Sequence, residues 1–347
     1  MCSSDLAVTG GEPVGVALVG SGRMGAFHGE TLARRLPGVR LAAVADPAPG
    51  VAERLAADLG ADRAYADPAE AFADPAVGAV VIAAPARFHA GLVVAAAEAG
   101  KGVFCEKPMA LALADADRAI AAARAAGVVL QVGFNRRFAP DWAAARALLE
   151  DGRLGTPRLL RSVTRDPGGF DPSRVPPDTI FNETLIHDFD TLRFLNPGAE
   201  AVEVYAAADA LVEPAWRDQG LLDTAVVVVR FDNGAVGVAE ACFEAAYGYD
   251  VRGEVLGSGG MATVGDGRST GMVFSDAAGR TVETARSDQE LLAGAYVAEL
   301  AAFADAVRGA TPARVGGEDA RAALVIALAA ARSVRAGRPV RTGEVAT

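Results

Sequence analysis

Three residue patterns in this sequence are of types that carry chemistry, and the first is a glycine-rich loop. Residues 20–25 read Gly-Ser-Gly-Arg-Met-Gly and follow an apolar run, 14–20, that predicts a buried strand. Gly20, Gly22 and Gly25 permit a tight turn and a close approach of the main chain to a pyrophosphate, whose charge the following helix N-terminus attracts. The loop predicts a dinucleotide site. Glycines that merely turn a strand into a helix are the alternative explanation.

An acidic residue supports the dinucleotide site. Asp46 ends the second predicted strand, about twenty residues beyond the last glycine, where a carboxylate binds the ribose hydroxyls of adenosine. A carboxylate about 4 Å from a 2′-phosphate would repel it by roughly 4 kcal/mol at an effective dielectric of 20. We therefore expect NAD, with NADP disfavoured. The other expected cofactor contacts are Arg23, Met24, Pro85, Glu106 and Lys107.

The second and third patterns are a lysine after a strand and a histidine among acids. Lys107 follows the predicted strand 102–105, and ligands bind at the carboxyl ends of parallel strands. A surface lysine paired with Glu106 is the alternative. Glu183, His187 and Asp190 have i, i+4 and i+7 spacing and so share one face of a predicted helix, 184–195. An acid one turn before a histidine orients the imidazole of a general base; a metal site or a solvated charge cluster has the same spacing.

The remaining histidines and the cysteines predict little chemistry. His28 and His89 lack acidic companions in this pattern, so we expect His28 on a helix surface or in packing. We expect His89 to begin a helix near the cofactor cleft. Cys2, Cys105 and Cys242 have no C-x-x-C spacing, so we expect no disulfide framework and no metal site.

The first half of the chain predicts the scaffold for these motifs. Between residues 13 and 134, short apolar runs without alternating polarity are separated by amphipathic helices, which is typical of a parallel sheet covered on both faces. We therefore expect an α/β fold with an N-terminal doubly wound Rossmann domain, preceded by an irregular segment, 1–12. The expected strands are 14–20, 41–45, 79–83, 102–105 and 128–132, and the expected helices are 22–35, 51–59, 89–99 and 114–126.

The second half follows another pattern. A helix, 139–150, and a strand, 159–165, precede a Pro/Gly-rich loop, 166–178, which we expect to shape specificity. Asp232-Asn233-Gly234 predicts a tight hairpin turn. We expect an α+β domain over 135–347 with a largely antiparallel, open sheet. Its further expected strands are 202–210, 224–231, 236–243, 251–257 and 261–264, and its closing helices are 293–308 and 318–336, the last packing back on the Rossmann domain.

Composition and charge exclude several classes of function. The chain of 347 residues has a net charge of −11 and is 51% hydrophobic, which fits two ordinary domains and argues against binding to nucleic acid or to an anionic membrane. Its start has no basic segment followed by an apolar one, and no apolar stretch approaches the ~20 residues of a membrane span. We therefore expect a cytoplasmic protein.

In this order and spacing the motifs are specific enough to indicate a family. The glycine loop, Asp46, Glu106-Lys107-Pro108 and the segment 186–190 resemble the Gfo/Idh/MocA oxidoreductases over residues 13–341. Segments 131–138, 184–195 and 247–250 are most similar to the inositol 2-dehydrogenases and related cyclitol or sugar dehydrogenases. The resemblance implies a Rossmann domain, a second domain with an open sheet, and a homodimer or homotetramer formed through that sheet.

The resemblance also implies roles for individual residues. Lys107 would orient the substrate and assist proton movement, and His187 would take the proton from the hydroxyl that is oxidised. Glu183 stands where the inositol enzymes usually have aspartate, and would orient His187. The implied substrate contacts are Asn135, Arg136, Asp166, Glu183 and Asp190, with Tyr247 or Tyr249 supplying a further hydroxyl.

The expected activity is NAD-dependent hydride transfer between a secondary hydroxyl of a polyol, a cyclitol or sugar, and the nicotinamide. Two alternatives stay open: an NAD-using glycosidase that oxidises its substrate only transiently, and a non-catalytic NAD-sensing protein. Lys107 and His187 argue against the sensor, because a sensor needs no acid–base pair.

Overall fold

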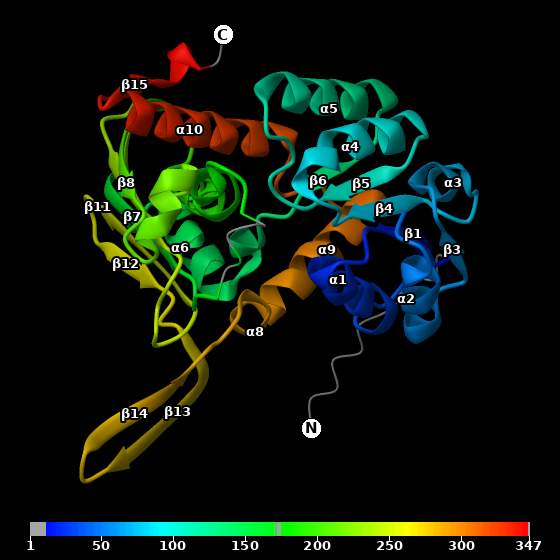
Figure 1. Cartoon of the computed structure of the whole chain (residues 1–347), viewed down its shortest axis with the longest axis horizontal. Coiled ribbons are helices and arrows are strands. Elements are labelled where there is room, and N and C mark those ends of the chain that lie inside the picture. Colours follow the sequence, from blue (N-terminus) through cyan, green and yellow to red (C-terminus); the bar gives the residue numbers. More distant parts are fainter. Residues whose placement is uncertain (1–11, 170, 172–174, 346–347) are drawn as a thin grey trace.

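A computed structural model describes residues 12–169, 171 and 175–345 of the chain. The segment expected to be irregular, 1–12, lies outside these residues except for Glu12, and so do positions 170 and 172–174 of the loop 166–178. Within the described residues the chain forms two large sheets and a separate two-stranded ribbon (Figure 1).

The first sheet has six strands in the order β3-β2-β1-β4-β5-β6, and all its recorded pairings are parallel. The apolar runs are buried on both faces because helices cover both, which confirms the predicted doubly wound Rossmann sheet. A short strand and a short helix between residues 63 and 73 were not predicted, because neither has enough residues to show a period. The elements are β1 (Val14–Val19), α1 (Arg23–Arg34), β2 (Val39–Ala45), α2 (Val51–Leu59), β3 (Arg63–Tyr65), α3 (Pro68–Ala73), β4 (Ala79–Ile82), α4 (His89–Glu98), β5 (Gly102–Cys105), α5 (Leu113–Ala126) and β6 (Leu130–Val132).

The second sheet has seven strands in the order β12-β11-β7-β10-β9-β8-β15. Every recorded pairing in it is antiparallel except β7 with β10, so the largely antiparallel sheet is confirmed. The predicted hairpin turn joins β9 to β10, with Gly234 at a φ of 87°. The strands are β7 (Pro157–Arg165), β8 (Ala201–Asp209), β9 (Thr224–Phe231), β10 (Val236–Cys242), β11 (Asp250–Gly257), β12 (Met261–Val264) and β15 (Val340–Arg341).

Helices from the second half connect the two sheets. Helix α9 (Ala293–Val307) lies under the Rossmann sheet, where Leu300 and Phe303 share a core with Leu18 of β1 and Phe104 of β5. Helix α10 (Gly317–Ala336) packs against both α5 and β8 and so spans the two sheets (Figure 1). The remaining helices are α6 (Pro140–Glu150), α7 (Ile186–Phe194) and α8 (Asp288–Leu291).

A two-stranded ribbon projects from the body (Figure 1). It consists of β13 (Arg268–Asp276) and β14 (Gly279–Thr284), and nearly all of its residues are exposed. This ribbon was not predicted from the sequence, because it has no buried face that would impose an apolar alternation. Its base leads directly into α8, which borders the site described below. No helix in the described part of the chain is long and apolar enough to cross a membrane.

Candidate active site

The glycine loop has the geometry of a cofactor cradle. Gly20 has a φ of 95°, and a Cβ there would lie 2.7 Å from both Ala83 O and Ala84 N. A Cβ at Gly25 would overlap the carbonyl group of Gly20, so both outer glycines are required for packing. A Cβ at Gly22 would meet only open space. The middle glycine therefore leaves the space through which a pyrophosphate approaches the main chain.

Asp46 lies beside this loop at the end of β2. Its Oδ2 accepts a hydrogen bond from Ser21 N at 2.8 Å and its Oδ1 accepts one from Ala48 N at 2.9 Å. The carboxylate is thus held in place by main-chain donors and keeps lone pairs for ribose hydroxyls. The buried Ser21 Oγ has no hydrogen-bond partner among the described residues. The open space at Gly22, the fixed carboxylate and the unpartnered hydroxyl fit NAD, which Gly20, Gly22, Gly25 and Asp46 would hold.

Lys107 follows β5 in a turn whose Lys107–Pro108 peptide bond is cis. Its Nζ donates to the main-chain carbonyl of Glu183 at 2.9 Å. The alternative, a surface lysine whose amine pairs with Glu106, is therefore wrong. Glu106 is buried, and its carboxylate bonds His28 Nε2 at 2.6 Å and Lys107 N at 3.1 Å. The lysine amine is therefore directed toward the second domain.

The structure corrects the expectation that His28 lacks acidic companions. His28, Glu106 and Glu299 of α9 form a buried cluster whose polar atoms lie within 4.8 Å of one another. The 2.6 Å between His28 and Glu106 is a hydrogen-bond distance, shorter than the about 3.3 Å between two ligand atoms of a tetrahedral zinc ion. Burial, together with the Glu106 charge, raises the pKa of Glu299 well above its usual range. The geometry is that of a proton-holding cluster. The signal missed in the sequence is that His28 lies three residues after Gly25, on the helix that faces β5.

His187 is positioned by α7 at the edge of the same cleft. Its ring packs edge-on against Phe134, with centroids 6.0 Å apart, and its buried Nδ1 has no hydrogen-bond partner in the described part of the chain. Burial, and then the charges of Lys107 and Arg136, lower the pKa of His187 well below its usual value. The imidazole is therefore neutral near pH 7, which is the state of a base that is ready to accept a proton.

The predicted helical face of Glu183, His187 and Asp190 is wrong in two respects. Residues Ile180–Thr184 form a π-helical turn, and α7 begins only at Ile186, so Glu183 is not one α-helical turn before His187. No hydrogen bond joins their side chains among the bonds recorded for the described residues. The π turn adds a residue to the turn, and it changes the direction in which Glu183 projects.

Asp190 is a structural anchor and does not line the cavity. Its carboxylate accepts from Arg137 Nε at 2.8 Å and from Arg137 Nη2 at 2.5 Å, and its exposure is 1%. Arg137 also bonds Asp319 of α10 at 2.9 Å. The expectation that Asp190 contacts substrate is therefore wrong, because both of its oxygens bond a buried arginine that no sequence motif marks.

Asn135 and Arg136 do line the cavity, from the turn after β6. Arg136 is buried and held by Asp188 at 2.7 Å and by Thr164 Oγ1 at 2.6 Å. Asp188 in turn accepts from the hydroxyls of Ser162 and Thr164 at 2.5 and 2.7 Å. This network fixes the arginine through side chains of α7 and β7.

A pair of acids faces the lysine from the second domain. Asp166, just after β7, and Asp288 of α8 both line the cavity. Burial, and then the Asp288 charge, raise the pKa of Asp166 to about 7. Asp288 bonds Arg23 Nη1 at 2.8 Å and Tyr296 Oη at 2.9 Å, so it connects the glycine loop to α9. Asp288 and Tyr296 were missed because no local motif precedes them.

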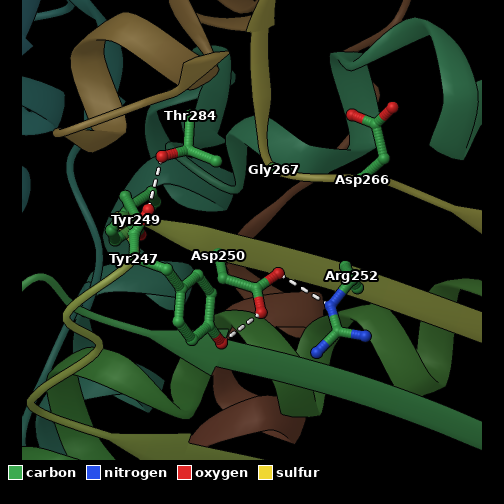
Figure 2. Close-up of a pocket in the computed structure, with 7 residues that line it drawn as sticks. All are labelled: Tyr247, Tyr249, Asp250, Arg252, Asp266, Gly267 and Thr284. Carbon is green, nitrogen blue, oxygen red and sulfur yellow. Dashed lines mark hydrogen bonds and ion pairs between the residues drawn. The ribbon is translucent and has the colours of Figure 1, made fainter. Parts of the chain in front are cut away.

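The two tyrosines expected to contact substrate occupy different places. Tyr249 lines the cavity that holds His187 and Lys107. Tyr247 lines a neighbouring cavity of about 250 Å³ at the base of the ribbon, where its hydroxyl donates to Asp250 at 2.8 Å. Figure 2 shows this second cavity, with Arg252 bonding the same carboxylate. Of the two tyrosines, Tyr249 lines both cavities and Tyr247 lines the second one, so Tyr249 is the one of the pair that is placed to contact substrate.

One cavity of about 210 Å³ brings most of the expected residues together. It lies between the glycine loop, the turn after β5, the π-helical turn and α8. The residues Asp46 and Pro85 lie elsewhere at the edge of the Rossmann sheet, Pro85 exposed at the start of a short turn after β4. The cavity is lined by Arg23, Met24, Glu106, Lys107, Asn135, Arg136, Thr164, Asp166, Thr179, Glu183, Thr184, His187, Phe243, Tyr249, Asp288, Leu292 and Tyr296.

Comparison with known families and proteins gives consistent matches. Residues 14–134 match the model of an oxidoreductase family with an NAD-binding Rossmann fold, and residues 142–263 match the C-terminal domain of the same Gfo/Idh/MocA family. A myo-inositol 2-dehydrogenase of Thermotoga maritima is 38% identical over 95% of this chain and 99% of its own. A scyllo-inositol 2-dehydrogenase (NAD(+)) of Bacillus subtilis is 36% identical over 94% and 95%.

A solved structure agrees with these matches. The myo-inositol dehydrogenase of Lactobacillus casei, in complex with NAD(H) and myo-inositol, is 26% identical and superposes with a TM-score of 0.86 over 95% of this chain and 96% of its own. The fold is thus shared along nearly the whole chain, and the family is the one that the resemblance in the sequence indicated.

Proposed function

Because the chain belongs to the Gfo/Idh/MocA family of NAD-binding oxidoreductases, we propose that it is an NAD-dependent dehydrogenase of an inositol-like cyclitol or sugar. It moves a hydride between a secondary hydroxyl carbon and the nicotinamide. Residues 13–134 hold the cofactor, and most of 135–347 shapes the substrate pocket and the contacts between subunits.

The observation that carries the proposal is the meeting of a neutral histidine and a lysine in one cavity with the glycine loop. His187 and Lys107 both line it, and so do Arg23 and Met24 of the loop. The Lys107 charge is among the causes that lower the pKa of His187, so the two groups act on each other. A polyol needs several fixed polar contacts, and Asn135, Arg136, Asp166, Glu183 and Tyr249 supply them.

Each side chain has a separate task in the proposed reaction. NAD⁺, held by the glycine loop and Asp46, would supply the acceptor for the hydride of the carbinol carbon. His187, which is uncharged near pH 7, takes the hydroxyl proton. Lys107, whose amine is fixed by one hydrogen bond to Glu183 O, keeps two donors for the oxygen that becomes negative.

The carboxylates and Arg136 orient the ring of the substrate. Arg136 is held by Asp188 and Thr164 and presents a buried positive charge whose position does not depend on substrate. Asp166 has a pKa of about 7, so it donates to or accepts from a substrate hydroxyl according to its protonation. Glu183 acts on the substrate from the π-helical turn rather than through His187.

A substrate panel tests the proposal. Inositol isomers, their keto forms and free pyranoses are each incubated with NAD⁺ or NADH, and the absorbance of NADH is followed, with H187A as the inactive control. Turnover of at least one cyclitol or sugar is expected. If all of them are inert with both cofactor forms, the proposal fails. Release of an aglycone from a glycoside without net NADH would instead favour a glycosidase.

We also propose that subunits associate through the open face of the second sheet. Four large apolar side chains on four of its strands are exposed, and their exposures are 52% for Leu159, 45% for Tyr205, 44% for Val226 and 57% for Met261. An apolar sheet face of this kind favours association with a second copy. Light scattering after size exclusion should give a dimer or tetramer, and Y205E with V226E should dissociate it; a monomeric wild-type protein would contradict this.

A further inference from the structure

His89 is buried where two loops of the cofactor edge meet. It is the first residue of α4 and is 2% exposed. Its Nδ1 lies 2.8 Å from the carbonyl oxygen of Pro108, and its Nε2 lies 2.6 Å from the carbonyl oxygen of Ala84. Ala84 follows β4 and packs beside Gly20, while Pro108 directly follows Lys107. The ring therefore joins the loop beside the cofactor cradle to the turn that carries the lysine.

The two carbonyl oxygens that contact the His89 ring favour one charge state of the imidazole. A main-chain carbonyl oxygen accepts hydrogen bonds and cannot donate them. A neutral imidazole has one N–H, so it satisfies one of these carbonyls and directs a lone pair at the other. The imidazolium has an N–H on each nitrogen and donates to both. The 2.8 Å contact is an ordinary hydrogen-bond distance, and the 2.6 Å contact is at least as short as a charge-assisted hydrogen bond.

A buried cation needs a compensating charge, and Glu106 provides it. Burial acts to raise the pKa of the Glu106 carboxyl, but His28, Lys107 and His89 outweigh this and lower it. Glu106 is therefore an anion at neutral pH. Arg87, two residues before His89, has its guanidinium over the Phe88 ring at 4.4 Å, and both side chains are exposed. The negative partner of His89 is thus inside the protein, on the turn after β5.

We propose that His89 is a positioning residue, held as an imidazolium, that fixes the Lys107 turn against the loop of the cofactor cradle. It touches neither substrate nor the reacting atoms and acts through the two carbonyls that it bonds. A shift of about 1 Å in a reacting group costs on the order of a hundredfold in rate, so a tie between these two loops has a direct effect on Lys107. The role of Lys107 rests on the proposed function; the charge of His89 does not.

The charge is tested by NMR on protein labelled with ¹⁵N and ¹³C in histidine. The chain has three histidines, so H28Q, H89Q and H187Q assign the ring signals. At pH 7.5 we expect both ring nitrogens of His89 to carry hydrogen, and E106Q, which removes the compensating charge, to convert His89 to one tautomer. A wild-type His89 ring with one protonated and one unprotonated nitrogen would overturn the proposal.

The positioning role is tested by kinetics on the full-length enzyme. H89F keeps an aromatic ring and removes both donors, so kcat should fall about tenfold to a hundredfold. H89Q keeps one amide donor group and should recover part of this loss. E98Q, on the exposed end of the same helix, is the matched control and should stay within twofold of wild type.

Three outcomes are distinguished by these experiments. A folded H89F enzyme, checked by its circular dichroism melt, whose kcat is within twofold of wild type overturns the positioning role. If H89F does not fold, the kcat of H89Q tests the positioning role, and the ring NMR of the wild type tests the charge. A kcat of H89Q within twofold of wild type then overturns the positioning role. If the wild type turns over no cyclitol or sugar, the proposed function fails while the NMR result still decides the charge of His89.

Discussion

The buried pair of Arg137 and Asp190 offers a test that separates a structural residue from a substrate contact. Asp190 lies in the middle of the helix that carries His187, and the sequence places it with the substrate. In the structure its two oxygens bond one guanidinium at 2.8 and 2.5 Å, with 1% exposure. The perturbation is D190A, which leaves Arg137 buried with Asp319 as its remaining ion-pair partner among the described residues.

The expected magnitude follows from this geometry. Burial raises the pKa of Asp190, and Arg137 opposes the rise without cancelling it, so the intact pair contributes little net stability. Removing one partner is different, because the remaining charge stays buried, and this costs about 3–5 kcal/mol. Since Asp319 still bonds Arg137, we expect about 3 kcal/mol, which for a chain of this length lowers the melting temperature by about 4 °C.

The assay measures stability and substrate binding on the same variants. D190A should melt about 4 °C lower, while KM for the best polyol of the panel changes less than about threefold. D319A removes the other, partly exposed carboxylate that bonds Arg137, and it should lower the free energy of unfolding by under about 1 kcal/mol. A substrate contact would behave in the opposite way, with KM rising about tenfold or more. An unchanged melting temperature together with that rise in KM would refute the structural assignment.

Three further predictions concern the cofactor, the lysine and Asp166. D46N should lower the preference for NAD over NADP, measured as the ratio of kcat/KM values, from about a thousandfold; equal values in the wild type would refute the charge argument. K107A should lose at least about a hundredfold in kcat while NAD affinity, measured by fluorescence titration, stays within threefold; a tenfold weaker cofactor would contradict this. Because the native pKa of Asp166 is about 7, the folded state holds the carboxyl proton more tightly than the unfolded chain. The stability that the protonated carboxyl contributes is therefore present below about pH 4 and is lost as pH rises through 7. D166N should therefore gain about 2 kcal/mol relative to wild type at pH 8, after allowance for partial exposure, and nothing at pH 4; denaturant melts at both pH values measure this, and an equal effect at both would reject the shifted pKa.

Much of the cofactor half could be predicted from the sequence because its signals are local. The strand before Gly20, the loop itself and Asp46 lie within one β-α-β segment, and each glycine position has a steric reason that is visible in the structure. Lys107 was found for the same reason, since it follows a strand whose carboxyl end must face the cleft. In this half of the chain, residues that are close in sequence are also close in space.

The substrate half was predicted less completely because its contacts depend on tertiary structure. The i, i+4 rule failed for Glu183 because a π-helical turn changes the period just before α7. Asp190 was assigned to substrate because the family resemblance implied that contact. Its partner in the structure, Arg137, is 53 residues away, and no motif links the two. Asp288 and Tyr296 come from the far end of the chain, and only the packing of α8 and α9 brings them to the cavity.

The central claim is that His187 is the base of an NAD-dependent dehydrogenase, and single-turnover formation of NADH tests it most directly. Wild type and H187Q are mixed with NAD⁺ and the best substrate of the panel, and NAD affinity is measured separately for each. We predict that NADH formation slows by about 100- to 10,000-fold in H187Q while NAD affinity stays within threefold. An H187Q enzyme that forms NADH within threefold of the wild-type rate would contradict it.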